Sequence, residues 1–128
     1  MTVLLMQIGI VILLIALWIG FQYLRLRSSA KLLSNLEFED LMRQGQVVDV
    51  REPAVFRQNH ILGARNIPHY QFKESVSALR KDKPVLLYSG DTATRLIPQA
   101  SYLKKRGYGP IYVLNGGFNQ WTGKTKSL

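Results

Sequence analysis

The stretch Val85-Leu86-Leu87-Tyr88-Ser89-Gly90-Asp91-Thr92-Ala93-Thr94-Arg95 decides the fold of this chain. Four apolar residues that favour β structure, 85–88, run into a small polar loop, 89–95. A helical pattern follows and ends at Lys104-Lys105-Arg106-Gly107. In a strand–loop–helix unit, the backbone N–H groups of the loop turn toward one point, and ligands bind at the carboxyl ends of such strands. We therefore expect residues 89–95 to form a possible anion-binding or ligand-binding loop.

Composition limits the functions open to the chain. Its 128 residues suit one small domain of about 100 residues with an appendage. The net charge of +9 favours an anionic membrane surface or nucleic acid as a partner. Because the basic residues are scattered without interleaved aromatic residues, we expect no nucleic-acid partner. The absence of cysteine excludes disulfides, thiolate metal sites and every cysteine nucleophile.

The first 24 residues have the composition of a membrane span. Residues 3–24 carry no charge, and their only clearly polar side chains are Gln7 and Gln22. As a helix rising ~1.5 Å per residue, this run is about 33 Å long, which matches a hydrocarbon core of about 30 Å. Three aromatic residues cluster at its end, as in an interfacial belt, namely Trp18, Phe21 and Tyr23.

The charges beside this run predict its orientation. Arg25, Arg27 and Lys31 follow the span, and no Lys or Arg precedes it. The positive-inside rule then predicts a single-pass signal anchor of the cell membrane, with the C-terminal domain in the cytoplasm. The alternatives are a cleaved secretory signal, which needs a basic segment before a shorter apolar run, and a helix buried in a globular core. A domain this small could hardly surround such a helix.

The remainder of the chain reads as a linker, one α/β domain and a tail. We expect a basic juxtamembrane linker over 25–33, the domain over 34–123 and a C-terminal tail over 124–128. Apolar runs predict strands at 46–50, 67–68, 85–88 and 111–114. Helical patterns, the first with a capping box at Ser34, predict helices at 36–44, 53–58 and 71–80, another capped by Thr94, and a last one at 118–121. Alternating strands and helices predict a parallel sheet covered on both faces.

Several motifs, taken in order, resemble those of the rhodanese-like domain. They are Asp49-Val50-Arg51-Glu52, His60 to Pro68, Val85 to Tyr88, Gly107-Tyr108, Val113 to Phe118, and Trp121. The resemblance covers roughly residues 34–121. It implies the rhodanese fold, a parallel five-stranded sheet flanked by helices, and a family chemistry of sulfur transfer.

The chain departs from this family at the residues that carry the chemistry. The family's enzymes have a Cys directly after the strand, a Gly three residues on and an Arg five on. Here Ser89, Thr92 and Thr94 occupy those positions, and Arg95 is displaced by one residue. A Ser hydroxyl cannot form the persulfide intermediate, and it needs an adjacent base to act as a nucleophile. The loop contains no His, and His60 and His69 lie elsewhere in the sequence.

We therefore expect a membrane-anchored, catalytically inactive rhodanese-like module with no catalytic residue, metal or cofactor. It would bind a partner protein or a small anion at the cytoplasmic face of the membrane. The alternatives are a sulfurtransferase-related enzyme that relies on a partner's cysteine, a Ser-dependent hydrolase, and a basic membrane-surface domain with no ligand in the loop.

Individual residues of the expected site also have structural interpretations. Asp49 and Arg51 could line a pocket from the end of a strand or form a structural ion pair. His60 fits a hydrogen-bonded loop residue better than a metal ligand, because no second ligand accompanies it. Ser89, Thr92 and Thr94 could simply cap a helix and satisfy turn amides. The positive charge of Arg95 would favour binding of an anion by the loop, whereas the negative charge of Asp91 would oppose it.

Overall fold

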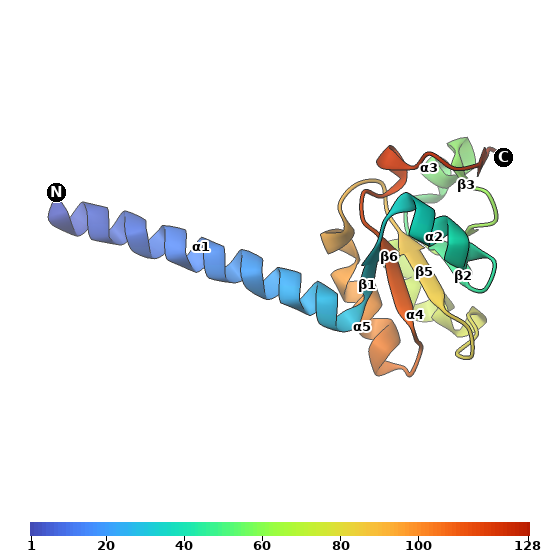
Figure 1. Cartoon of the computed structure of the whole chain (residues 1–128), viewed down its shortest axis with the longest axis horizontal. Coiled ribbons are helices and arrows are strands. Elements are labelled where there is room, and N and C mark those ends of the chain that lie inside the picture. The colour runs from blue at the N-terminus through green and yellow to red at the C-terminus, as the bar shows by residue number, and fades with distance from the viewer.

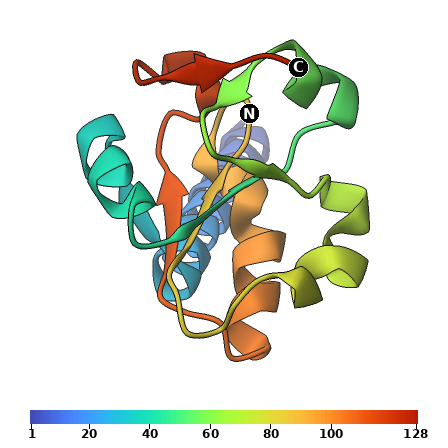
Figure 2. The ribbon, with the colours of Figure 1, turned by 90° about the vertical axis from the view of Figure 1, so that its right-hand side faces the viewer.

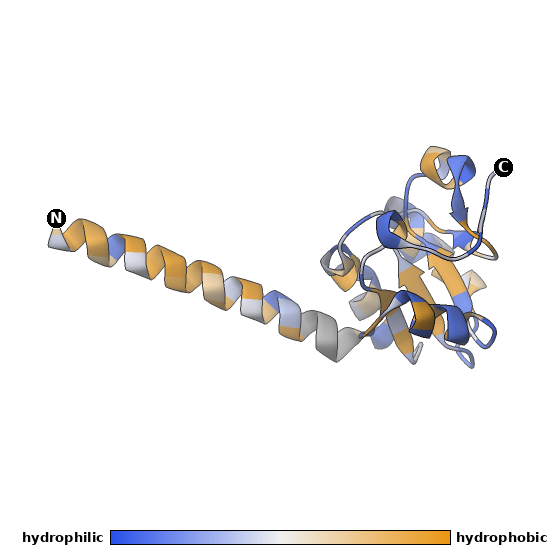
Figure 3. Ribbon diagram, turned by 45° about the horizontal axis from the view of Figure 1, so that its top comes forward, coloured by the Kyte–Doolittle hydropathy of each residue, from blue (hydrophilic) through white to orange (hydrophobic). Residues whose placement is uncertain are grey.

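A long helix projects from a globular α/β domain. The computed structural model describes residues 1–24 and 30–128 with their side chains. Helix α1 (Thr2–Ser29) extends away from the domain (Figure 1). Its segment Thr2–Leu24 is long and apolar enough to cross a membrane, and the domain buries none of it (Figure 3).

The domain is organised around a five-stranded sheet in which every pairing is parallel. Its strands are β1 (Lys31–Leu33), β2 (Gln46–Asp49), β4 (Arg65–Asn66), β5 (Val85–Tyr88) and β6 (Ile111–Leu114), in the order β1-β6-β5-β2-β4. All four residues of β5 are buried, as expected for the central strand of a sheet that is covered on both faces. The five-stranded parallel rhodanese fold that the sequence predicts is confirmed.

Helices cover both faces of this sheet (Figure 2). On one face, helix α2 (Asn35–Met42) buries Phe38 against Leu86 and Tyr88. On the other, α4 (Phe72–Ser75) and α5 (Ile97–Lys105) pack over Val48, Val85 and Leu87. The residues at helical spacing in these last two segments are all buried in the cluster on this second face: Phe72, Val76, Leu79, Leu96, Ala100 and Leu103.

Both flanks of the expected domain contribute strands. Residues 31–33, expected to end the linker, form β1 and pair with β6 at the edge of the main sheet. In the expected tail, β7 (Thr125–Lys126) pairs in antiparallel fashion with β3 (His60–Ile61). The sequence analysis did not predict these strands, because such short segments carry too little periodicity to show their pairing.

Other element boundaries shift by a few residues. The strand expected at 67–68 lies at 65–66, where it pairs with β2. Ser34 caps α2 through a complete capping box with Glu37, as predicted. The helix expected over 71–80 is instead a 3₁₀ turn, η1 (His69–Gln71), followed by α4 and a second turn, η2 (Val76–Ala78). Helix α3 (Pro53–Gln58) begins with proline, as expected.

The segment after the candidate loop differs from the prediction in its first turn. Thr94 does not cap a helix. It lies inside a 3₁₀ turn, η3 (Ala93–Leu96), and α5 begins only at Ile97, with Pro98 in its first turn. Gly107, with φ of 87°, ends α5 as predicted. The last helix, expected at 118–121, is another 3₁₀ turn, η4 (Phe118–Gln120).

Candidate functional site

The candidate loop is docked onto a neighbouring turn. The Ser89 carbonyl accepts a hydrogen bond from the Phe118 amide at 2.8 Å, and the Gly90 carbonyl accepts one from Asn119 at 2.9 Å. Gly117, at φ 66°, makes this approach possible because a Cβ there would overlap the backbone of residues 89 and 91. The loop carbonyls therefore face η4. The amides of residues 90–92 donate no backbone hydrogen bond to any described residue.

Ser89 lies at the end of β5, where the chain leaves the sheet. Its side chain is buried, and the hydroxyl donates to the Thr92 carbonyl at 3.4 Å. No base among the described residues accepts this proton. The acceptor of the Ser89 hydroxyl is therefore a backbone carbonyl and not the basic side chain that activates a serine nucleophile.

A cavity of about 750 Å³ opens beside this residue. Its walls come from the end of β2, the start of α3, the loop after β4, the candidate loop, the first turn of α5 and η4. The lining residues are Val50, Arg51, Glu52, Val55, His69, Ser89, Gly90, Asp91, Arg95, Pro98, Gln99 and Asn119. Of the sequence-predicted site residues, this cavity brings together Arg51, Ser89, Gly90, Asp91 and Arg95, and it does not include Thr92, Ala93, Thr94 or Asp49.

Each of the two arginines that line this cavity is paired with a carboxylate. Arg95 Nε lies 3.4 Å from Asp91 Oδ1; the two residues are four positions apart, with the Arg95 side chain largely exposed and the Asp91 side chain partly exposed. Arg51 is paired with Asp49, and Glu52 contributes a further negative charge to the lining. The site therefore presents little unbalanced positive charge to an incoming anion.

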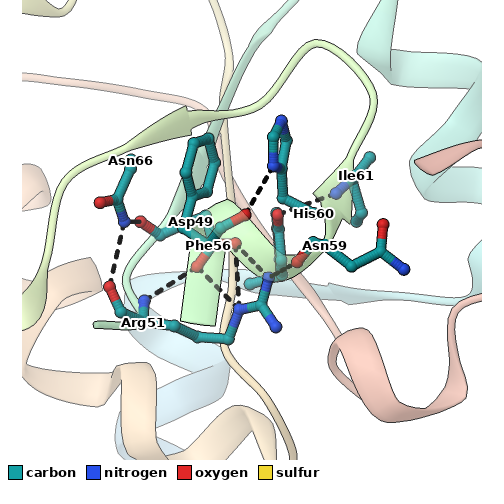
Figure 4. Close-up of polar contacts among 8 residues, drawn as sticks. Asp49, Arg51, Phe56, Asn59, His60, Ile61 and Asn66 are labelled. Atoms are coloured by element: carbon teal, nitrogen blue, oxygen red, sulfur yellow. Dashed lines mark hydrogen bonds and ion pairs between the residues drawn. The ribbon is translucent and has the colours of Figure 1, made fainter. Parts of the chain in front are cut away.

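Asp49 and Arg51 form the structural ion pair that the sequence suggested (Figure 4). The Asp49 carboxylate accepts hydrogen bonds from the Arg51 amide at 2.9 Å, from Nε at 3.0 Å and from Nη2 at 2.7 Å. Arg51 Nη2 also donates to the Asn59 carbonyl at 2.7 Å, and the guanidinium lies 4.3 Å from the centre of the Phe118 ring. Burial alone would lower the pKa of Arg51, but the hydrogen bonds and charge of Asp49 raise it above its usual value.

Tyr88, the last residue of the central strand β5, lies next to the same ion pair. Its hydroxyl accepts a hydrogen bond from the Ile61 amide at 3.1 Å, and its ring lies 5.7 Å from the Arg51 guanidinium. Burial, reinforced by the neighbouring Asp49 carboxylate, raises the pKa of Tyr88 well above its usual value. Tyr88 is therefore a neutral structural residue at physiological pH.

The two histidines have different environments. His60 is buried, stacks on Phe56 with ring centres 3.7 Å apart, and donates from Nδ1 to the Phe56 carbonyl at 2.7 Å (Figure 4). It is the hydrogen-bonded structural residue that the sequence predicted. His69, by contrast, is exposed and lines the cavity that contains Ser89. Sequence reasoning missed His69, because 20 residues separate it from Ser89 and only the fold places β4 beside β2.

The described residues contain no cluster of three or more His, Cys, Asp or Glu side chains able to hold a metal. Asn66, another residue missed from sequence, donates to the carbonyls of Asp49 and Arg51 at 3.1 and 3.0 Å. Its role is to hold the end of β2 at the cavity wall.

The comparisons with known proteins agree with this architecture. The sequence matches the family model of the rhodanese-like domain over residues 34–124. The chain belongs to the rhodanese-like family. The uncharacterized protein YqhL of Bacillus subtilis is 46% identical over 97 residues, and this alignment covers 76% of each chain.

Two further relatives bear on activity and fold. The thiosulfate sulfurtransferase GlpE of Pseudomonas aeruginosa is 35% identical over 78 residues, which cover 59% of this chain and 68% of that protein. The crystal structure of a rhodanese-like domain protein from Staphylococcus aureus superposes with a TM-score of 0.66 over 77% of this chain and 98% of that chain. At 19% identity, this last similarity shows the rhodanese fold alone. The present rhodanese-like chain is thus related to sulfurtransferases but contains no cysteine.

Proposed function

We propose that this chain is a membrane-anchored rhodanese-like protein that does not transfer sulfur and uses the cavity beside Ser89 to bind a partner protein. The observation that carries the proposal is the state of Ser89, whose hydroxyl donates to the Thr92 carbonyl in a chain without cysteine. A hydroxyl in this environment has neither the sulfur chemistry of a thiolate nor a base to activate it.

The charge balance of the cavity favours a protein ligand over a small anion. Arg51 and Arg95 are each paired with a carboxylate, so a free anion competes with an internal one. A cavity of about 750 Å³ is within the range of sites that bind small molecules and side-chain-sized groups. Its mixed lining, with Val50, Val55 and Pro98 beside polar groups, suits a short segment of another protein.

Activity measurements test the first half of this proposal. The full chain, purified in mild detergent, is assayed for sulfur transfer from thiosulfate or mercaptopyruvate to cyanide. We expect no turnover above the uncatalysed rate in either the parent or Ser89→Ala. Turnover in the parent that disappears in Ser89→Ala would contradict the proposal. Turnover that appears only when a cysteine-bearing membrane fraction is added would favour an enzyme that relies on a partner's cysteine.

Site-specific crosslinking tests the second half. A photoreactive amino acid is placed at Val55, a partly exposed residue of the cavity wall, and in a matched control at Leu36, an exposed residue of α2 on the other face of the sheet. We expect discrete protein adducts in membranes from the Val55 variant and not from the Leu36 variant. Equal adducts at both positions would place the binding surface elsewhere.

We further propose that α1 anchors the domain at the cytoplasmic face of the membrane. The support is the apolar segment Thr2–Leu24, which the domain does not bury, and the basic residues that follow it in the sequence. Protease added to intact cells should leave the domain uncut, whereas protease added after permeabilisation should digest it. Release of the protein by a carbonate wash, or digestion from outside, would disprove this topology.

A further inference from the structure

We infer that the domain has a second interaction surface, a basic face made by Lys104, Lys105 and Arg106 at the end of α5, which binds anionic lipid headgroups. The inference goes beyond ligand binding in the cavity, and it depends on the proposed anchoring of the chain through α1. The Arg51 and Arg95 side chains of the cavity are not part of this surface.

The position of α1 brings the basic face near the membrane. Helix α1 contacts α5 and η3. Ala30, directly after α1, is buried in the same core cluster as Ala100 and Leu103 of α5. The anchor therefore leaves the domain on the face of the sheet that α5 covers (Figure 1). The last turn of α5 carries Lys104 and Lys105, and Arg106 follows it.

The helices that cover the two faces of the sheet differ in charge. Helix α5 and the residue that follows it have Lys104, Lys105 and Arg106 and no acidic residue. Helix α2, which covers the opposite face of the sheet, has Glu37, Glu39 and Asp40 and no basic residue. A negatively charged surface on the side of α1 therefore attracts α5 and repels α2. This arrangement favours one orientation of the domain on an anionic bilayer.

The distance between the span and the domain is compatible with this attraction. Only five residues, 25–29, separate the apolar segment Thr2–Leu24 from Ala30. In a helix, five residues span about 7.5 Å. The screening length in physiological salt is about 8 Å, so charges at the start of the domain still experience the surface potential of anionic lipids. Folding packs α5 against α1, and so brings residues 104–106, remote in sequence, to the side of the domain from which α1 leaves.

Amine labelling of the full chain tests the inference. The protein is reconstituted in nanodiscs of phosphatidylcholine alone or with about one third phosphatidylglycerol, and acetylation of each lysine is followed by mass spectrometry. We expect Lys104 and Lys105 to be modified about fivefold more slowly with the anionic lipid, the effect of one basic residue near such a surface. Lys126 in β7 and Lys124 just before it serve as internal controls and should not change, because β7 lies at the far side of the domain from α1 (Figure 1).

Two variants with equal loss of charge complete the design. In Lys105→Gln/Arg106→Gln, the protection of Lys104 should decrease severalfold, whereas Lys124→Gln/Lys126→Gln should keep it. Addition of 0.5 M salt should abolish the protection in the parent, because the interaction is between exposed charges. Equal labelling of Lys105 in both lipids would overturn the inference while leaving the anchoring intact. Failure of the chain to enter nanodiscs of either composition would instead disprove the anchoring.

Discussion

Arg51 Nη2 lies 2.7 Å from Asp49 Oδ2, and this buried ion pair joins the end of β2 to the wall of the candidate site. Asp49 is completely buried, whereas the Arg51 side chain is 10% exposed and reaches the cavity. The guanidinium also covers the ring of Phe118, whose amide docks the candidate loop by donating to the Ser89 carbonyl. One residue pair thus connects the sheet, the loop and the cavity.

Replacement of Asp49 should be strongly destabilising. In Asp49→Asn the Arg51 guanidinium stays buried without its carboxylate, and the loss of one partner of a buried pair costs about 3–5 kcal/mol. The measurement is unfolding of the full chain in mild detergent. As a control, Asp82→Asn breaks the exposed pair between Arg80 and Asp82 and should not change stability measurably. An Asp49→Asn variant as stable as the control would show that the pair has no structural importance.

Tyr88→Phe should alter the response of the protein to alkaline pH. Because the folded protein raises the pKa of Tyr88, the hydroxyl ionises first in the unfolded state, above pH ~10. Ionisation of Tyr88 in the unfolded state therefore lowers the free energy of unfolding of the parent by about 1.4 kcal/mol per pH unit above that point. The Tyr88→Phe variant has no hydroxyl to ionise and lacks this pH dependence. The parent should therefore lose stability more steeply than the variant between pH 10 and 11.

At neutral pH the same variant should be less stable than the parent. Its Ile61 amide loses the buried acceptor that the Tyr88 hydroxyl provides, at a cost of about 1–3 kcal/mol. Unfolding curves at several pH values measure both effects. Parallel curves for parent and variant over the whole alkaline range would contradict the assigned environment of Tyr88.

Ser89→Cys alone should restore little sulfur transfer. The new thiol would lie beside Asp91, whose carboxylate disfavours a thiolate, and the nearest loop cation, Arg95, is paired with Asp91. The loop also has Thr92 and Thr94 where the family's enzymes have Gly and Arg. We expect turnover far below that of a cysteine-bearing relative assayed in parallel. Full activity from this single change would show that the loop is aligned wrongly with the family.

Anion binding by the loop should be weak and controlled by Asp91. A helix-end interaction contributes about 0.3–1 kcal/mol when exposed, so one carboxylate in the same loop can cancel most of it. We expect millimolar binding of sulfate, seen as chemical-shift changes at the amides of residues 89–95. Asp91→Asn should strengthen the binding, and Arg95→Ala should weaken it. If neither the parent nor Asp91→Asn shows shifts there, residues 89–95 do not form an anion site.

Much of the fold could be predicted because its signals are local. Four consecutive apolar residues predicted the strand β5, which is buried. The spacing of Leu96, Ala100 and Leu103 predicted the buried face of the helical segment that contains α5, and Ser34 with Glu37 predicted a capping box. Strands β1, β3 and β7 escaped prediction because their two or three residues have no periodicity of their own. Their pairing energy comes from partners far along the chain.

The sequence by itself determined the absence of a thiolate, the apolar length of residues 3–24 and the family to which the domain belongs, since each depends on residue identity and order. Only the tertiary structure decided which groups share the cavity. It placed His69 there, kept Asp49 out of it as the partner of Arg51, and directed the Ser89 hydroxyl to a backbone carbonyl. It also placed the basic end of α5 on the side of the domain from which α1 leaves. Such relationships depend on the packing of helices across a sheet, which joins residues whose separation along the chain gives no local signal.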